Sequence, residues 1–188
     1  RVRAEGKKDK LRLLADNIDY DRRSHLALAT GKPVMESEDE RGRVASIRAR
    51  RLLPNRETRR AEAIDSVMVD RDTLKATGDY AVFDDRADRG WLYGHPRAWD
   101  NETTVTGDTL EVWTEKRTLQ PFVVRSNATL DYKGVRPGSE GETTRLTGHR
   151  MDVFFSDDEM DSLMSVGDAR NEYQAVARPA KTAETNLA

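Results

Sequence analysis

Three histidines and two acidic pairs are the residues of this chain with the clearest potential for chemistry. His25, His95 and His149 lack the spacing of metal ligands, and the 188 residues include no cysteine, so the sequence predicts no metal site, no cofactor and no disulfide. Carboxylate pairs that could hydrolyse a polysaccharide occur at Asp84-Asp85 and Asp157-Asp158. Both pairs fall in expected turns, where acidic residues commonly serve the turn itself. The chain is therefore not expected to be an enzyme.

A cluster of arginines is the one local departure from a balanced charge. The net charge of −2 argues against nucleic acid as a partner, because phosphate binding needs a basic excess on one face. Arg48, Arg50 and Arg51 gather around one expected turn, where they could contact an anionic group such as a phosphate. Alternatively, they keep an outward-facing hairpin soluble and blunt the edge of a sheet.

The elements that would position these residues recur along the chain. A small residue precedes apolar positions three and five residues later, and this unit repeats at intervals of 34, 29, 29 and 41 residues. Its anchors are Ala15, Ala49, Gly78, Gly107 and Gly148. Such spacing without helical periodicity indicates stacked strand pairs that bury one face only against their neighbours. Function is then expected along a shared surface rather than at a single catalytic point.

Alternation of apolar and polar residues predicts about ten strands. They span residues 11–20, 24–36, 43–53, 60–70, 73–83, 89–100, 103–114, 118–132, 143–155 and 159–174. Of the chain's residues, 36% are hydrophobic and 35% are charged, a composition that suits a thin layer of strands with one solvent-exposed face. No apolar run is long enough for a membrane helix. We expect one domain over residues 1–174 and a C-terminal tail over 175–188.

One face of each expected strand is apolar, because residues two positions apart on a strand share a face. Asp19, Glu111 and Asp152 point to the other face. We expect the apolar face either to form an ordinary packed core or to line a trough between two sheets that do not fully close. The candidates for the trough are Ile18, Tyr20, Leu52, Ala81, Phe83, Leu110, Val112, Phe122, Val124, Met151 and Val153.

The repeated unit resembles the OstA-like domain of lipopolysaccharide transport. Residues 15–21, Ala-Asp-Asn-Ile-Asp-Tyr-Asp, and 29–34, Ala-Thr-Gly-Lys-Pro-Val, are similar to the strand-and-turn phrase of that family. Residues 146–173 are similar to the end of such a domain, and the Thr-Gly-Asp triplets at 77–79 and 106–108 extend the resemblance over nearly the whole chain. The second unit departs from the phrase, with Ala49-Arg50 in place of a glycine and an acidic residue.

This resemblance implies an all-β fold, a repetitive antiparallel β-jellyroll or β-taco of two incompletely closed sheets. It also implies a periplasmic, non-catalytic protein of the LptA, LptC or N-terminal LptD type. In such proteins the interior shields the acyl chains of lipid A, while the sugars of lipopolysaccharide stay in water. Strands near residues 11–20 and 160–173 are then expected to pair edge to edge with related jellyroll domains, or head to tail with further copies of the chain.

A secreted or cell-surface β-repeat protein, which binds carbohydrate or serves a structural role, is the alternative. Trp91, Tyr93, Trp99 and Trp113 would then form an exposed aromatic platform for sugars. Packing across neighbouring strands explains the same four residues equally well. Whether their rings face the trough or the solvent distinguishes the two interpretations.

Overall fold

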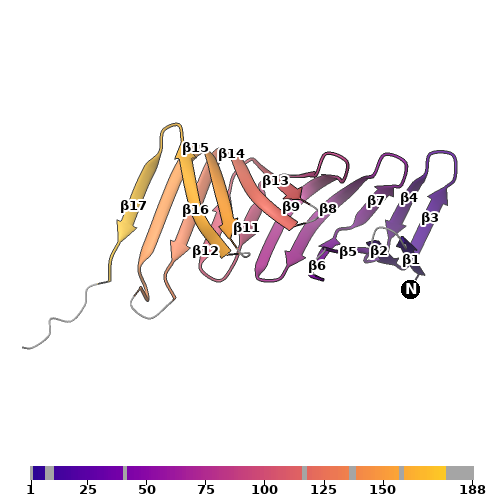
Figure 1. Ribbon diagram of the computed structural model, residues 1–188, viewed down its shortest axis with the longest axis horizontal. Coiled ribbons are helices and arrows are strands. Elements are labelled where there is room, and N and C mark those ends of the chain that lie inside the picture. Colours follow the sequence, from indigo (N-terminus) through magenta and orange to yellow (C-terminus); the bar gives the residue numbers. More distant parts are fainter. Residues whose placement is uncertain are drawn as a thin grey trace, which may run out of the picture.

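The computed structural model describes residues 2–6, 11–39, 42–115, 118–135, 139–156 and 159–176. Within these ranges the chain forms seventeen strands, and no helix there could span a membrane. The strands stack along the long axis of an elongated molecule, with β1 and β17 at opposite ends (Figure 1). Asp157, Asp158 and the predicted tail beyond residue 176 lie outside the described residues.

Ten extended arms build the molecule, and each arm runs through a corner from one sheet to the other. The arms span residues 11–21, 26–38, 44–55, 60–71, 74–84, 89–99, 103–115, 118–133, 143–156 and 159–174. Six arms break into two strands at the corner and four continue through it. With β1, the ten predicted strands therefore become seventeen. The corners are only a few residues long, so the apolar pattern does not reveal the breaks.

The arms divide into two antiparallel sheets that share four long strands. The first sheet contains, in spatial order, β3 (Asn17–Asp21), β4 (Leu26–Thr30), β7 (Arg51–Asn55), β8 (Arg60–Arg71), β9 (Leu74–Asp84), β10 (Arg89–Tyr93), β13 (Thr109–Glu115), β14 (Thr118–Lys133), β15 (Thr143–Ser156) and β16 (Glu159–Val166). The second sheet contains β1 (Val2–Gly6), β2 (Leu11–Ala15), β5 (Val34–Glu38), β6 (Val44–Arg48), β8, β9, β11 (Arg97–Trp99), β12 (Thr103–Thr106), β14, β15 and β17 (Arg170–Gln174). The predicted all-β antiparallel jellyroll is confirmed.

The corners explain the repeated unit of the sequence. Every second arm turns through two consecutive residues in the left-handed conformation. These pairs are Gly31-Lys32, Asp65-Ser66, Gly94-His95, Ser126-Asn127 and Gly167-Asp168. Glycine adopts this conformation freely, whereas most other residues do so at a cost of about 1–2 kcal/mol. The neighbouring arm donates a backbone amide to the corner, as from Asp16 to the Gly31 carbonyl at 3.0 Å and from His149 to the Gly167 carbonyl at 2.9 Å.

The anchors of the repeats are small because the two sheets converge at the corners. A Cβ added at Gly107 would lie 2.3 Å from Val124 Cγ1, and one added at Gly148 would lie 2.3 Å from Ser165 Oγ. Neither glycine has a left-handed φ. Close approach of a neighbouring strand, rather than backbone conformation, therefore requires glycine at these two positions.

The second unit, which departs from the repeated phrase, builds the same corner with different residues. Asp65-Ser66 takes the left-handed conformation there, and the Arg50 amide donates to the Asp65 carbonyl at 2.8 Å. Arg51 Nη2 also lies 3.3 Å from Asp65 Oδ2. The pairing of β8 with β9 shifts register between Ile64 and Val67, and the pairing of β14 with β15 shifts in the same way between Arg125 and Ala128. The unit is therefore altered in sequence and not in architecture.

Inward-facing side chains form rows that cross the strands. In the first sheet, an inner row near the corners contains Ile18, Ala29, Leu52, Ala63, Ala81, Leu92, Leu110, Val124, Met151 and Ser165. A mouth row, two residues farther from the corners, contains Tyr20, Ala27, Pro54, Ala61, Phe83, Gly90, Val112, Phe122, Val153 and Leu163. The inner row of the second sheet contains Ala4, Leu13, Met35, Ile47, Val69, Ala76, Ala98, Val105, Leu130, Leu146 and Asn171. One buried apolar cluster contains members of both inner rows, so the sheets face each other.

The N-terminal edge of the second sheet differs from the prediction. The sequence predicts a free edge over residues 11–20, but β2 pairs with β1 along its whole length. The side chains of Val2 to Glu5 are all exposed, so β1 has no buried face from which the sequence could predict it. Among the described strands, the free edges are β3 and β16 in the first sheet and β1 and β17 in the second.

Candidate functional site

All eleven trough candidates lie on the inward face of the first sheet. Those in the inner row are Ile18, Leu52, Ala81, Leu110, Val124 and Met151, and those in the mouth row are Tyr20, Phe83, Val112, Phe122 and Val153. Apart from Ile18, which is half-buried, the inner-row candidates are 0–4% exposed. The structure therefore brings the candidates together as one wall.

The opposite wall, on the second sheet, was not among the candidates. Its inner row includes the buried residues Leu13, Ile47 and Val105. Each of these three lies two positions before an anchor, at Ala15, Ala49 and Gly107 respectively. Reading the alternation backward from each anchor, as well as forward, would have identified this wall.

The mouth row is less uniformly covered than the inner row. Phe122 and Val153 are buried, whereas Phe83, Val112 and Leu163 are partly exposed and pack against the core from its margin. Tyr20, on the first arm, is 50% exposed, and its hydroxyl lies 3.2 Å from His25 Nδ1. Apolar side chains that reach both the core and the solvent thus follow the opening between the sheets.

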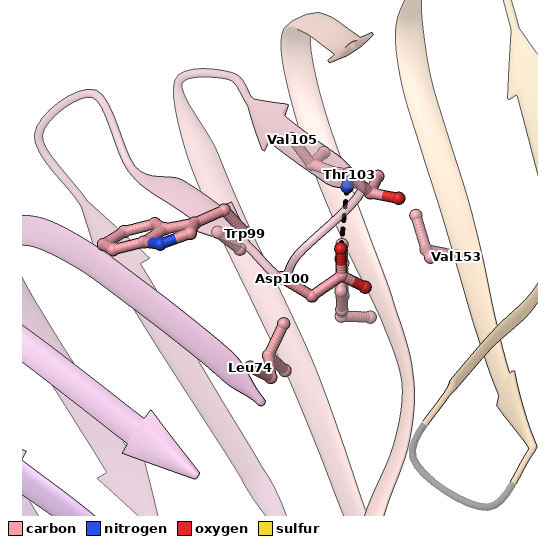
Figure 2. Close-up of a pocket in the computed structure, with 8 residues that line it drawn as sticks. Leu74, Trp99, Asp100, Thr103, Val105 and Val153 are labelled. Atoms are coloured by element: carbon pink, nitrogen blue, oxygen red, sulfur yellow. Dashed lines mark hydrogen bonds between the residues drawn. The ribbon is translucent and has the colours of Figure 1, made fainter. Parts of the chain in front are cut away.

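A small cavity lies between the sheets where their mouth rows meet. Leu74 and Val105 approach it from the second sheet, and Val153 approaches it from the first (Figure 2). Asp100 closes the adjoining turn, where its carboxylate accepts the Thr103 amide at 2.7 Å. The cavity measures about 10 Å³, close to the smallest space that holds one water molecule. In this structure the two sheets are closed on each other at this point.

An ion network occupies one stretch of the mouth of the second sheet. Asp39, which is buried, accepts hydrogen bonds from Arg43 Nε at 2.8 Å and from Arg71 Nη2 at 2.9 Å. Burial, together with the nearby charge of Arg43, lowers the pKa of Arg71. Charged groups therefore lie beside the apolar rows at the rim of the interior.

Outward-facing carboxylates of the first sheet are covered by arginines. Glu111 and Asp152 point away from the core, as expected, yet they are only 5% and 7% exposed. Arg125 Nη2 donates to Glu111 Oε2 at 2.9 Å, and Arg150 Nη2 donates to Asp152 Oδ2 at 2.8 Å. The hydrogen bond to Asp152 raises the pKa of Arg150. This part of the outer face is an ordered layer of ion pairs.

The four aromatic residues of the alternative interpretation do not form one platform. Trp91, Tyr93 and Trp113 lie on the outer face of the first sheet, whereas Trp99 lies on the second, with its indole directed away from Val153 (Figure 2). The rings of Tyr93, Trp99 and Trp113 are already in contact with other side chains. Tyr93 stacks on Tyr80 with a centroid distance of 5.9 Å, and Arg89 and Arg97 lie over Trp113 and Trp99, respectively. Packing between neighbouring strands accounts for these contacts.

The three arginine candidates lie beside the corner of the third arm and not at the mouth. Arg48 Nη2 is 3.6 Å from Asp70 Oδ2, Arg51 contacts Asp65, and Arg50 is exposed at the corner itself. An anion bound there would lie outside the interior. The placement fits the alternative in which these arginines solubilise an outer surface.

The residues considered for metal binding and hydrolysis are dispersed. His25, His95 and His149 lie at separate turns and corners, and the described part of the chain holds no group of three or more histidine and acidic side chains placed to bind a metal. Asp84 accepts the Arg86 and Ala87 amides at 3.1 Å, and Asp85 accepts a hydrogen bond from Arg59 Nε at 3.0 Å. Asp84 therefore stabilises its own turn, and Asp85 connects that turn to the turn that contains Arg59.

Comparison with known proteins agrees with this architecture. No protein-family model matches the chain, and no curated protein matches it. Among solved structures, the chain is similar to LptH from Pseudomonas aeruginosa, the LptA-homologous periplasmic component of a lipopolysaccharide transport device. The TM-score is 0.51 at 12% sequence identity, and the match covers 60% of this chain and 82% of LptH. The likeness establishes an LptA-like fold.

Proposed function

We propose, from its LptA-like fold, that this protein carries lipopolysaccharide through the periplasm without covalent chemistry. The acyl chains of lipid A lie between the two sheets, and the sugars stay in water. The observation that supports this proposal is the pair of predominantly apolar inner rows, which face each other along the stacked arms. Each methylene transferred from water to such a surface contributes about 0.8 kcal/mol. Similar rows on successive arms offer many near-equal positions, which suits movement along the interior.

Lipid uptake in this proposal requires the sheets to separate at the mouth. The cavity of about 10 Å³ between the mouth rows is far smaller than an acyl chain. The corners connect the sheets covalently on one side, and beyond the corners the packed side chains of the core hold the described parts of the two sheets together. The partly exposed Phe83, Val112 and Tyr132 are the first apolar groups that an arriving chain would contact.

The free edges support a place in a bridge of related domains. β16 and β17 end both sheets on one side, and the exposed apolar residues Met164 and Val166 lie on β16. β3 ends the first sheet on the other side, with most of its side chains exposed. Edge pairing with another jellyroll domain would satisfy the open backbone groups and extend the interior from one protein to the next.

The test is native mass spectrometry of the protein with lipopolysaccharide, using two aspartate variants of β13. Val112→Asp places a charge in the mouth row, whereas Thr109→Asp places one on the outer face of the same strand. Leu110→Asp is less suitable, because Leu110 is 4% exposed and its replacement threatens the fold. We expect lipid adducts with the wild type and with Thr109→Asp, and their loss with Val112→Asp. Equal binding by both variants would exclude the interior as the lipid site.

A further inference from the structure

The first and last strands of the second sheet hold equivalent positions at its two ends. β1 runs antiparallel to β2 of the first arm, and β17 runs antiparallel to β15 of the ninth arm. Because successive arms alternate in direction, β1 and β17 both run from the corner side toward the mouth. β1 therefore lies where the final strand of a preceding copy would lie if copies stacked end to end.

The sequences of the two strands also match in register. The inner row of the second sheet passes through Ala4 in β1 and Asn171 in β17. Aligned on this row, Arg3-Ala4-Glu5 corresponds to Arg170-Asn171-Glu172. Both strands thus present the sequence Arg-x-Glu at the same places relative to the sheet.

The strands against which they pair are matched as well. Glu5 lies opposite Arg12, with 3.3 Å between Glu5 Oε1 and Arg12 Nε, and Glu172 lies opposite Arg145. Each of these two arginines is followed by a leucine of the inner row. At these two central positions, β2 consequently offers the edge of a second copy the same arginine and leucine that β15 offers β17.

We infer that β1 is an internal mimic of β17, which covers the edge of β2 and competes there with β17 of a second copy of this chain. With β1 displaced, β16 can pair with β3 of the next copy while β17 pairs with its β2. Both pairings keep the antiparallel order, because the number of arms is even. With β1 in place, the first sheet still offers β3 as an antiparallel partner for β16, whereas the free edge of the second sheet is β1, which runs parallel to an incoming β17.

The contacts of β1 suit a strand that exchanges. Its side chains from Val2 to Glu5 are exposed, and it buries no apolar face. Arg3 Nε donates to Glu5 Oε1 at 2.9 Å, but exposed ion pairs contribute little to stability. Backbone pairing with β2 is therefore its main attachment, and β17 of another copy supplies the same pairing.

A disulfide lock tests the competition in the full chain. The chain has no cysteine, and Arg3 pairs with Leu14 across β1 and β2, so Arg3→Cys combined with Leu14→Cys gives one defined crosslink. Sedimentation velocity should show a monomer when the crosslink is oxidised and concentration-dependent association when the same protein is reduced. Equal association of the folded oxidised and reduced forms would overturn the inference.

Charge reversal tests the two strands separately. Glu5→Arg places like charges opposite each other on β1 and β2, and should strengthen self-association about fivefold. Glu172→Arg removes the matching charge of the incoming strand and should weaken self-association by a similar factor. Glu57→Arg, on the turn after β7, serves as the control and should change nothing. A Glu5→Arg protein that associates no more than the wild type would contradict the competition, whatever the result with lipid.

Discussion

Gly107 shows what the corners demand of a single residue. Its position next to Val124 leaves no room for a methyl group, although its backbone conformation would accept one. We expect Gly107→Ala to lower the free energy of unfolding by about 1–3 kcal/mol, because the strands must move apart to accommodate the Cβ. Urea unfolding followed by circular dichroism measures the change. Thr109→Ala, on the outer face nearby, should cost less than about 0.5 kcal/mol, and equal losses in the two variants would refute the close-approach explanation.

At the residue scale, the sequence predicted which side of the first sheet faces inward but not how deeply each side chain is buried. Period-two alternation placed Leu110 and Val112 on one face, and they share it. It could not show that Tyr20, in the same row as Val153, would be half exposed. Nor could it show that the outward-facing Glu111 would be buried beneath Arg125, because that burial depends on a neighbouring strand.

At the scale of elements, the left-handed corner is the feature that every second arm repeats. Three of these five corners begin with glycine, and the other two begin with Asp65 and with Ser126, the latter at φ 58°. Ser126→Gly removes the steric cost of this conformation, so we expect the free energy of unfolding to rise by about 0.5–1 kcal/mol. Thermal unfolding provides the measurement.

The reciprocal variant tests the same element. A Cβ at Gly94 would lie 2.3 Å from Asp79 Oδ2 and would also adopt φ 79°. We expect Gly94→Ser to lower the melting temperature, for both reasons together. If Ser126→Gly and Gly94→Ser shifted the melting temperature in the same direction, the corners would not be equivalent.

Elements were predictable to the extent that they carry an apolar pattern. The ten arms match the ten predicted strands because alternating apolar residues mark most of their length, although the five side chains of β17, at the end of the tenth arm, are all exposed. The division of an arm such as 11–21 into β2 and β3 was not predictable, because the apolar pattern runs through its short corner. β1 escaped prediction for the opposite reason, since a strand with four exposed side chains has no such pattern.

At the scale of the whole molecule, two sheets share one apolar interior that is closed along part of its mouth. If acyl chains enter this interior, as proposed, the mouth rows must separate around Leu74 and Val153, because the cavity that these residues line measures about 10 Å³. In that proposal the corners, where Gly107 and Gly148 pack tightly against neighbouring strands, would serve as the hinge.

The most direct measurement is the distance between the two sheets at the mouth. Double electron–electron resonance measures it with and without lipopolysaccharide. Thr73 and Ala87 lie in exposed turns at opposite ends of the fifth arm, and the absence of native cysteine permits Thr73→Cys and Ala87→Cys to carry the spin labels. We predict a longer distance with lipopolysaccharide, and no change when Val112→Asp is added. An unchanged distance in a protein that demonstrably binds lipopolysaccharide would contradict the account, because the lipid would then lie outside the two sheets.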